Sequence, residues 1–240
     1  MGGRGTAYWV GVSKRLKKMG SAQDAKYFQD LKSYMSMNYG IRVADELQNS
    51  DFQSVKAAAQ GLEDIVKEFP QAAGLFHELN GDEHRDRAYA SASFYGKVQL
   101  NPDKYTSRDV VEQSYKSDVA SKWHPTGTTA DSIPVHEAGH ILERALIDKN
   151  LGHQPMWSQA TAWNKHGEAT RVIGEACKVL KRTPAGKGLK NNDFVAQVSR
   201  YARENRSETL AECVADYHAN RENAAPLSRE VWKILRRELG

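Results

Sequence analysis

Two histidines stand four positions apart in the segment HEAGH at 136–140. Four positions turn an α-helix by about 400°, so both imidazoles would leave one helix face about 6 Å apart at Cβ. That separation lets His136 and His140 reach one metal ion at about 2.0–2.1 Å. Glu137 would lie beside the ion, where it could accept a proton from a metal-bound water without being a ligand. The spacing therefore predicts a metal site that activates water.

Chance alone would place an HExxH motif in roughly one of sixty chains with this length and composition. The residues around the motif are therefore needed to support a metal site. Four apolar residues would give a helix over 131–148 a buried side: Ile133, Val135, Ile141 and Leu142. Unpartnered histidines on a buried face cost free energy, and a metal ion would relieve that cost. Gly139 costs up to about 1 kcal/mol inside a helix. We interpret Gly139 as a point of close packing against a neighbouring segment.

A third metal ligand is expected further along the chain, because hydrolytic zinc sites use three protein ligands and leave a fourth position for water. The segment SETLAECVADY at 207–217 reads as a helix that carries Glu208 and Glu212 on one face, one turn apart. We expect Glu208 to be the third ligand and Glu212 to accept a hydrogen bond that orients a ligand imidazole. A surface helix with two acidic residues is the alternative.

The pair of motifs HEAGH at 136–140 and ETLAE at 208–212 resembles the gluzincin zinc metallopeptidases. The resemblance is strongest to the branch that contains the catalytic domain of anthrax lethal factor. It implies a zinc-dependent endopeptidase with a zincin-like fold and Zn²⁺ as its cofactor. In that enzyme the two histidines and Glu208 would bind the ion, and Glu137 would be the general base.

A tyrosine of that branch stands seven residues before the zinc-binding glutamate and faces the developing oxyanion. Tyr201 stands seven residues before Glu208. The resemblance therefore implies that Tyr201 donates a hydrogen bond to the tetrahedral intermediate. An ordinary tyrosine of the core or the surface is the alternative. The resemblance covers roughly residues 88–220, while residues 1–80 lie outside it and residues 150–200 have the character of an insertion.

Two segments upstream of the histidines also fit the resemblance. In such domains an antiparallel edge strand lines the cleft and pairs with an extended peptide, and residues 94–101 are expected to supply it. The segment WHPTGTT at 123–129 resembles the run-in of domains encoded by bacteriophages, often attached to head-assembly proteins. A phage or host protein is therefore an expected partner, and the protein could be associated with the virion.

The remaining sequence predicts an α+β protein that is mostly helical, with a small antiparallel sheet. Alternating residues at 88–101 predict two short strands, or one bent strand, around Gly96. Apolar spacing and breaker residues predict helices at 24–37, 51–69, 71–79, 107–122, 131–148, 156–182 with a break at Gly167, 194–201, 208–220 with Ser207 as N-cap, and a last helix from Pro226. The glycine-rich residues 1–23 are expected to be weakly ordered.

We expect two parts in the chain. Residues 1–80 would form a helical N-terminal region that docks a partner or covers the cleft, and residues 81–240 would form the zincin-like metallopeptidase domain. Among other residues, Cys213 is expected to be a small buried side chain, and Asp216 could support a ligand imidazole. The sequence does not place His124 relative to the cleft.

Composition narrows the classes of function. The 240 residues carry 34 basic and 30 acidic side chains, and a net charge of +4 is too small to indicate a nucleic-acid partner. No apolar run approaches the ~20 residues that span a bilayer, and no secretory signal is evident. Two cysteines do not make a disulfide framework. We therefore expect a cytoplasmic protein that acts on a protein or peptide, without a membrane partner.

A different class of function is also open. The chain could keep a zincin fold, with or without its metal, and act as a catalytically silent binding or assembly module, for example in phage head morphogenesis. Metal content and chelator-sensitive cleavage of peptides would separate this alternative from the peptidase.

Overall fold

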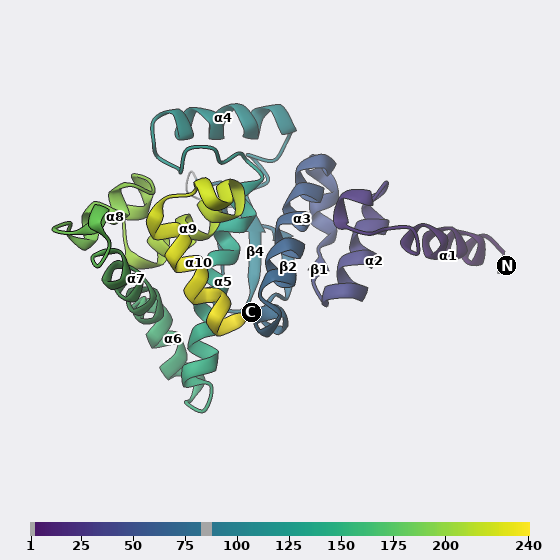
Figure 1. The fold of residues 1–240 in the computed structure, drawn as a ribbon. Coiled ribbons are helices and arrows are strands. Elements are labelled where there is room, and N and C mark those ends of the chain that lie inside the picture. Colours follow the sequence, from purple (N-terminus) through teal and green to yellow (C-terminus); the bar gives the residue numbers. More distant parts are fainter. Residues whose placement is uncertain (1–2, 83–87) are drawn as a thin grey trace.

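The computed structural model describes residues 3–82 and 88–240, and it confirms a mostly helical α+β fold (Figure 1). The described helices are α1 (Gly3–Leu16), α2 (Phe28–Tyr39), α3 (Phe52–Glu68), α4 (Arg108–Ala120), α5 (Ser132–Leu151), α6 (Met156–Asn164), α7 (Gly167–Leu180), α8 (Asn191–Ala196), α9 (Arg206–Asn220) and α10 (Pro226–Leu239). The described strands are β1 (Arg42–Val43), β2 (Glu78–Gly81), β3 (Ala90–Ala92) and β4 (Lys97–Leu100). Most predicted helices are therefore present, with ends shifted by a few residues.

Two segments of the N-terminal part differ from the prediction. Residues 1–23 were expected to be weakly ordered, yet α1 covers Gly3–Leu16 and extends away from the remaining helices (Figure 1). The helix predicted at 71–79 is a 3₁₀ turn over Pro70–Leu75, followed by β2. The reason is that Glu78–Gly81 lies between two other strands, and backbone pairing on both sides favours the extended chain over a further helical turn.

The sheet is mixed, which corrects the predicted antiparallel arrangement. Its order is β1-β2-β4-β3, with β1, β2 and β4 parallel and only β3 antiparallel to β4. A tight turn joins β3 to β4 and includes Gly96 with a φ of 75°, so these two strands run in opposite directions. The connection from β1 to β2 instead passes through α3, and such a crossover returns the chain in the same direction.

The predicted boundary at residue 80 falls inside β2. This strand pairs with β1 on one side and with β4 on the other, so residues 1–80 and 81–240 share one sheet. Aromatic packing also joins the two parts, since the rings of Phe69 and Trp232 lie 4.8 Å apart. The sequence pattern did not reveal this because strand pairing between distant segments leaves no local periodicity.

Helix α5 lies at the centre of the fold (Figure 1). It packs against α9, against α3 and against strand β3. Most of its residues are buried, so polar side chains on it must find partners inside the protein. The position of α5 between α9 and the sheet is what brings the motif at 136–140 to a second set of polar residues.

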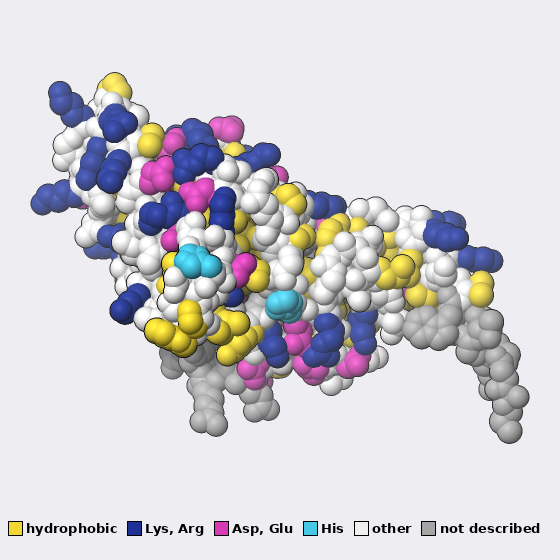
Figure 2. Space-filling model, turned by 90° about the horizontal axis from the view of Figure 1, so that it is seen from below, with side chains coloured by type: hydrophobic (Ala, Val, Ile, Leu, Met, Phe, Trp, Pro, Cys, Tyr) yellow, Lys and Arg dark blue, Asp and Glu magenta, His cyan; other side chains and the backbone are white. Residues whose placement is uncertain are grey.

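Two surface features complete the description. Hydrophobic side chains gather on the face seen from below (Figure 2), the side on which α6 lies, and Met156 and Trp157 of α6 are exposed. Within the described residues, no helix has both the length and the apolar character that a membrane-crossing helix needs.

Candidate metal centre

The three predicted metal ligands converge in the structure. Nε2 of His136 lies 3.0 Å from Oε2 of Glu208, and Nε2 of His140 lies 3.5 Å from the same oxygen. All three donor atoms lie within 4.8 Å of one another. Glu208 comes from α9 and stands 72 positions after His136, so the grouping is a product of the tertiary fold.

The spacing of these atoms suits a zinc ion. Two ligand atoms bound at about 2.0–2.1 Å in a tetrahedron lie roughly 3.3 Å apart. The two nitrogen–oxygen distances, 3.0 and 3.5 Å, lie on either side of that value. Two imidazoles and one carboxylate are also a ligand set that zinc uses in hydrolytic sites. The residues present therefore fit the predicted metal.

A buried hydrogen-bond chain fixes the orientation of His140. Its Nδ1 lies 2.8 Å from Oγ of Ser207, and Ser207 donates to Oε2 of Glu143 at 2.6 Å. Because the Ser207 proton goes to Glu143, Nδ1 of His140 must be the donor to Ser207. A neutral His140 with its proton on Nδ1 would offer the lone pair of Nε2 to a metal ion, on the side that faces Glu208. The main-chain N–H of Ala169 holds the other oxygen of Glu143.

Glu212, predicted to accept a hydrogen bond from a ligand imidazole, lies against His136 and is completely buried. Its Oε1 lies 2.8 Å from Nδ1 of His136, a close ionic contact whose direction is not aligned for a hydrogen bond. The same oxygen lies 3.0 Å from Nδ1 of His124, and the hydroxyl of Ser199 donates to Oε2 at 2.7 Å. The side chains of His124 and Ser199 thus hold the Glu212 carboxylate in place, with its charge against Nδ1 of His136.

The charges of the site are strongly coupled. Burial raises the pKa of Glu208, but its bonds with His136 and His140 outweigh burial and hold that pKa far below its usual range. Burial likewise raises the pKa of Glu212, yet contacts with His124 and His136 lower it to about 2. Burial lowers the pKa of His136, and the two carboxylates reverse this and raise it well above the usual value. Both carboxylates are therefore ionised at neutral pH, the form that binds a cation, and a metal ion would displace the proton that they favour on His136.

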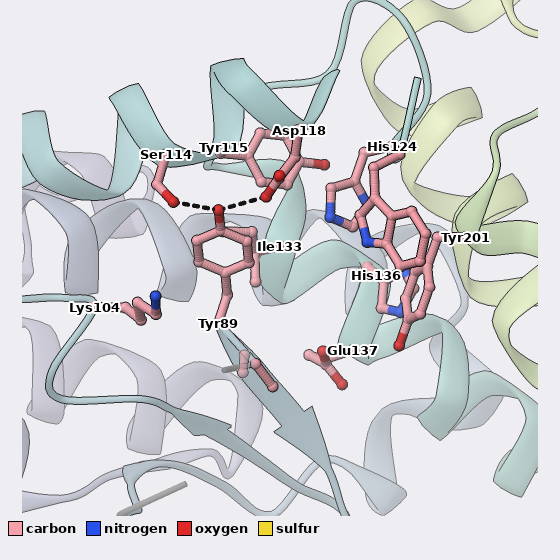
Figure 3. A pocket seen from close by; sticks show the side chains of 13 residues that line it. Tyr89, Lys104, Ser114, Tyr115, Asp118, His124, Ile133, His136, Glu137 and Tyr201 are labelled. Carbon is pink, nitrogen blue, oxygen red and sulfur yellow. Dashed lines mark hydrogen bonds between the residues drawn. The ribbon is translucent and has the colours of Figure 1, made fainter. Parts of the chain in front are cut away.

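Glu137 and Tyr201 line one end of a cavity beside His136 (Figure 3). The Tyr201 ring stacks on His136 with centroids 5.7 Å apart and on Trp123 at 5.3 Å. Burial raises the pKa of the Tyr201 hydroxyl, and the carboxylates of Glu208 and Glu137 raise it further. The hydroxyl therefore keeps its proton at neutral pH and is a hydrogen-bond donor beside Glu208.

An aromatic wall borders the other ligand. The Trp163 ring of α6 lies 6.5 Å from the ring of His140, and Phe94 lies 5.9 Å from Trp163. The guanidinium of Arg144 lies over the Phe94 ring at 4.4 Å and supports it from α5. The segment at 150–200 predicted as an insertion thus contributes a residue next to the site.

Three predictions near the site need correction. Ser207 does not cap α9, because the side chain of Asn205 accepts the hydrogen bond from Glu208 N–H and Ser207 is buried against His140. Asp216 does not support a ligand imidazole, because its carboxylate accepts from Asn220 and from the N–H of Ala225. These bonds secure the connection between α9 and α10.

The third correction concerns the strand expected to line the cleft. Residues 94–101 contain β4, which lies between β2 and β3 and is paired on both sides. The edges of the described sheet are β1 and β3, and β3 is the edge strand that packs against α5. The prediction rested on the placement of residues 94–101 before His136 in the sequence, and placement does not distinguish an inner strand from an edge strand.

Three residues that contact the site were not predicted from the sequence: His124, which bonds to Glu212, and Ser207 and Glu143, which are bonded to each other behind His140. Glu143 stands three positions after His140 and seven after His136, so helical spacing could have placed it on the same face. His124 lies in a loop, and no spacing rule connects it with Glu212. Cys213 is fully buried, as predicted, and burial raises the pKa of its thiol.

Comparisons of this chain with protein-family models, with curated proteins and with solved structures found no match.

Proposed function

We propose that this protein is a zinc-dependent endopeptidase of the gluzincin type. The observation that carries the proposal is the convergence of His136, His140 and Glu208 within 4.8 Å, with His140 bonded to the buried Ser207 and His136 in ionic contact with the buried Glu212. A bound zinc ion would lower the pKa of a coordinated water to about 7 and polarise a peptide carbonyl. The chain's own residues would supply the remaining steps.

Glu137 is the general base of the proposed reaction. It follows the first ligand directly and lines the cavity beside it. Its carboxylate would accept a proton from the attacking water and deliver that proton to the leaving amine, so that the C–N bond breaks with a neutral product. The Tyr201 hydroxyl would donate a hydrogen bond to the oxygen that gains negative charge.

Strand β3 would hold the substrate backbone. The N–H of Ser93 donates to Lys97 and the carbonyl of Tyr89 accepts from Asn101, so both residues direct main-chain groups toward β4. Alternate residues of an antiparallel strand face opposite edges, and the main-chain groups of Ala90 therefore face away from β4. In the described part of the chain no strand covers that edge, which suits pairing with an extended peptide.

The experiment that tests the proposal combines metal analysis with peptide cleavage. Purified protein is expected to contain about one zinc per chain and to cleave a mixed peptide library, and a chelator should abolish cleavage. Glu137→Gln should keep the zinc and lose cleavage by a factor of ~10² or more. Glu46→Gln, at an exposed site in the 3₁₀ turn Asp45–Asn49, is the matched control and should behave as the unaltered protein.

Two outcomes would contradict the proposal in different ways. Cleavage that survives in Glu137→Gln would rule out the mechanism. Protein that binds zinc but cleaves no peptide, with or without a chelator, would favour the alternative of a silent binding or assembly module.

A further inference from the structure

The cavity beside Glu137 extends well beyond the candidate metal centre. It has a volume of about 420 Å³ and runs from His136 and Glu137 of α5 to helix α4 (Figure 3). That volume exceeds what one long side chain fills, and pockets of this size commonly bind ligand groups. Its far end is made by residues that the proposed reaction does not use.

Three hydrogen-bonded side chains, Tyr89, Ser114 and Asp118, form the end of the cavity at α4. The hydroxyl of Tyr89 donates to Oδ2 of Asp118 at 2.6 Å and lies 2.6 Å from Oγ of Ser114 (Figure 3). Because the Tyr89 proton goes to Asp118, the Ser114 hydroxyl donates to the Tyr89 oxygen. The two bonds hold the Asp118 carboxylate in a fixed position on the wall of the cavity, and fixed polar groups of this kind determine specificity in binding pockets.

The charge of Asp118 is not neutralised by the described residues. No lysine, arginine or histidine of the described chain lies within ion-pair distance of its carboxylate. Tyr89 engages one oxygen only, which leaves Oδ1 able to accept a further bond. Lys104 is the one lysine or arginine among the described residues that line the cavity, and its ammonium lies over the Tyr89 ring, 5.7 Å from the centroid.

The walls between the two ends are aromatic. Tyr89, Tyr115 and Trp123 line the cavity, and Tyr115 is held flat against His124 with ring centroids 4.7 Å apart. Aromatic walls that lead to a carboxylate suit a side chain with an aliphatic stem and a cationic end, because the stem packs on the rings and the charge reaches the acid.

We propose that this cavity is a substrate pocket that binds the cationic side chain of a lysine or arginine next to the scissile bond, with Asp118 as the residue that determines this specificity. The inference rests on the proposed peptidase function, since the reacting bond would lie at the Glu137 end. Tyr89 and Ser114 act as positioning residues for the carboxylate.

The first test measures cleavage of three matched peptides that differ at one position: lysine, its uncharged isostere norleucine, or glutamate. The unaltered protein should cleave the lysine peptide with a kcat/KM at least about tenfold above that of the norleucine peptide. Asp118→Asn should reduce this ratio to about one. Asp109→Asn is the matched control, because Asp109 is an exposed carboxylate of the same helix and does not line the cavity, and it should leave the ratio unchanged.

The second test measures binding and does not depend on hydrolysis. Zinc-loaded Glu137→Gln protein should bind a fluorescently labelled lysine peptide about tenfold more tightly than the norleucine peptide, and adding Asp118→Asn should remove the difference. If the protein binds the lysine peptide selectively but the unaltered protein cleaves no peptide, the proposed peptidase function is refuted and the proposed binding of a cationic side chain is supported. Equal binding of the two peptides, or no binding of either, would refute the pocket.

Lys104 provides a second variant if Asp118→Asn fails to fold. Lys104→Met removes the opposing charge and should increase the preference for lysine over norleucine. A preference for glutamate that disappears in Lys104→Met would show that the ammonium sets the charge of the pocket and would overturn the assignment to Asp118.

Discussion

Gly139 of α5 and Ala211 of α9 lie backbone against backbone. A β-carbon added to Gly139 would stand 2.7 Å from Cα of Ala211 and 3.2 Å from its Cβ, closer than such atoms approach. Gly139 is inside the HEAGH motif, and Ala211 is inside the ETLAE motif. The contact therefore fixes the distance between the two helices that carry the three candidate ligands.

Gly139→Ala should lower both stability and zinc affinity. The added methyl group has to push α9 away from α5, and overpacking of this kind costs about 1–3 kcal/mol. Separation of the helices would also move Glu208 from the histidines, so zinc binding should weaken by at least about tenfold. Urea unfolding gives the first quantity and competition with a zinc-binding dye gives the second.

Gly174→Ala is the control for that substitution. Gly174 lies inside α7, and a β-carbon there meets nothing within 4 Å. Alanine should therefore stabilise the helix by roughly 0.5–1 kcal/mol. Equal effects of the two substitutions would contradict the packing role of Gly139.

Zinc should stabilise the folded protein through Glu208. At a free zinc concentration about 100 times the Kd, a site present only in the folded state adds about 2.7 kcal/mol. For a chain of this length that corresponds to a rise in Tm of roughly 5–10 °C. Glu208→Ala should lose most of the rise, as measured by differential scanning fluorimetry with and without a chelator. The same zinc-dependent rise in Glu208→Ala would exclude this residue as a ligand.

Tyr201→Phe should separate catalysis from binding. The substitution keeps the ring that stacks on His136 and Trp123, so folding and zinc content should not change. Loss of the donated hydrogen bond should lower kcat by about 10²–10³ with little change in KM, because the bond forms in the transition state. Steady-state kinetics on one peptide suffice, and an unchanged kcat would remove Tyr201 from the mechanism.

Ser207→Ala should weaken zinc binding without removing a ligand. The serine connects Nδ1 of His140 to the buried Glu143, and loss of such an orienting contact typically costs 10–100-fold in metal affinity. Ser117→Ala, on the exposed side of α4, is the control and should have no effect. Zinc affinity of Ser207→Ala equal to that of the control would mean that His140 is oriented by its packing alone.

Local features of this protein could be predicted from its residues and their spacing. Helical spacing of apolar residues predicted α5 and α9, although α5 is buried on most of its sides and not on one face alone. The relation between His136 and His140 followed from the same geometry, which depends only on a separation of four positions. Chemistry then identified a carboxylate as the missing ligand, and Glu208 was chosen for its place beside apolar neighbours.

The way in which these helices and strands meet could not be predicted, because it depends on contacts between distant segments. The approach of Glu208 to the histidines depends on the contact between Gly139 and Ala211, which no single helix encodes. The link from Glu212 to His124 and the cavity that ends at Asp118 join residues from different elements, and such contacts have no sequence period. The strand order of the mixed sheet has no sequence period either, because it depends on which distant segments pair with each other.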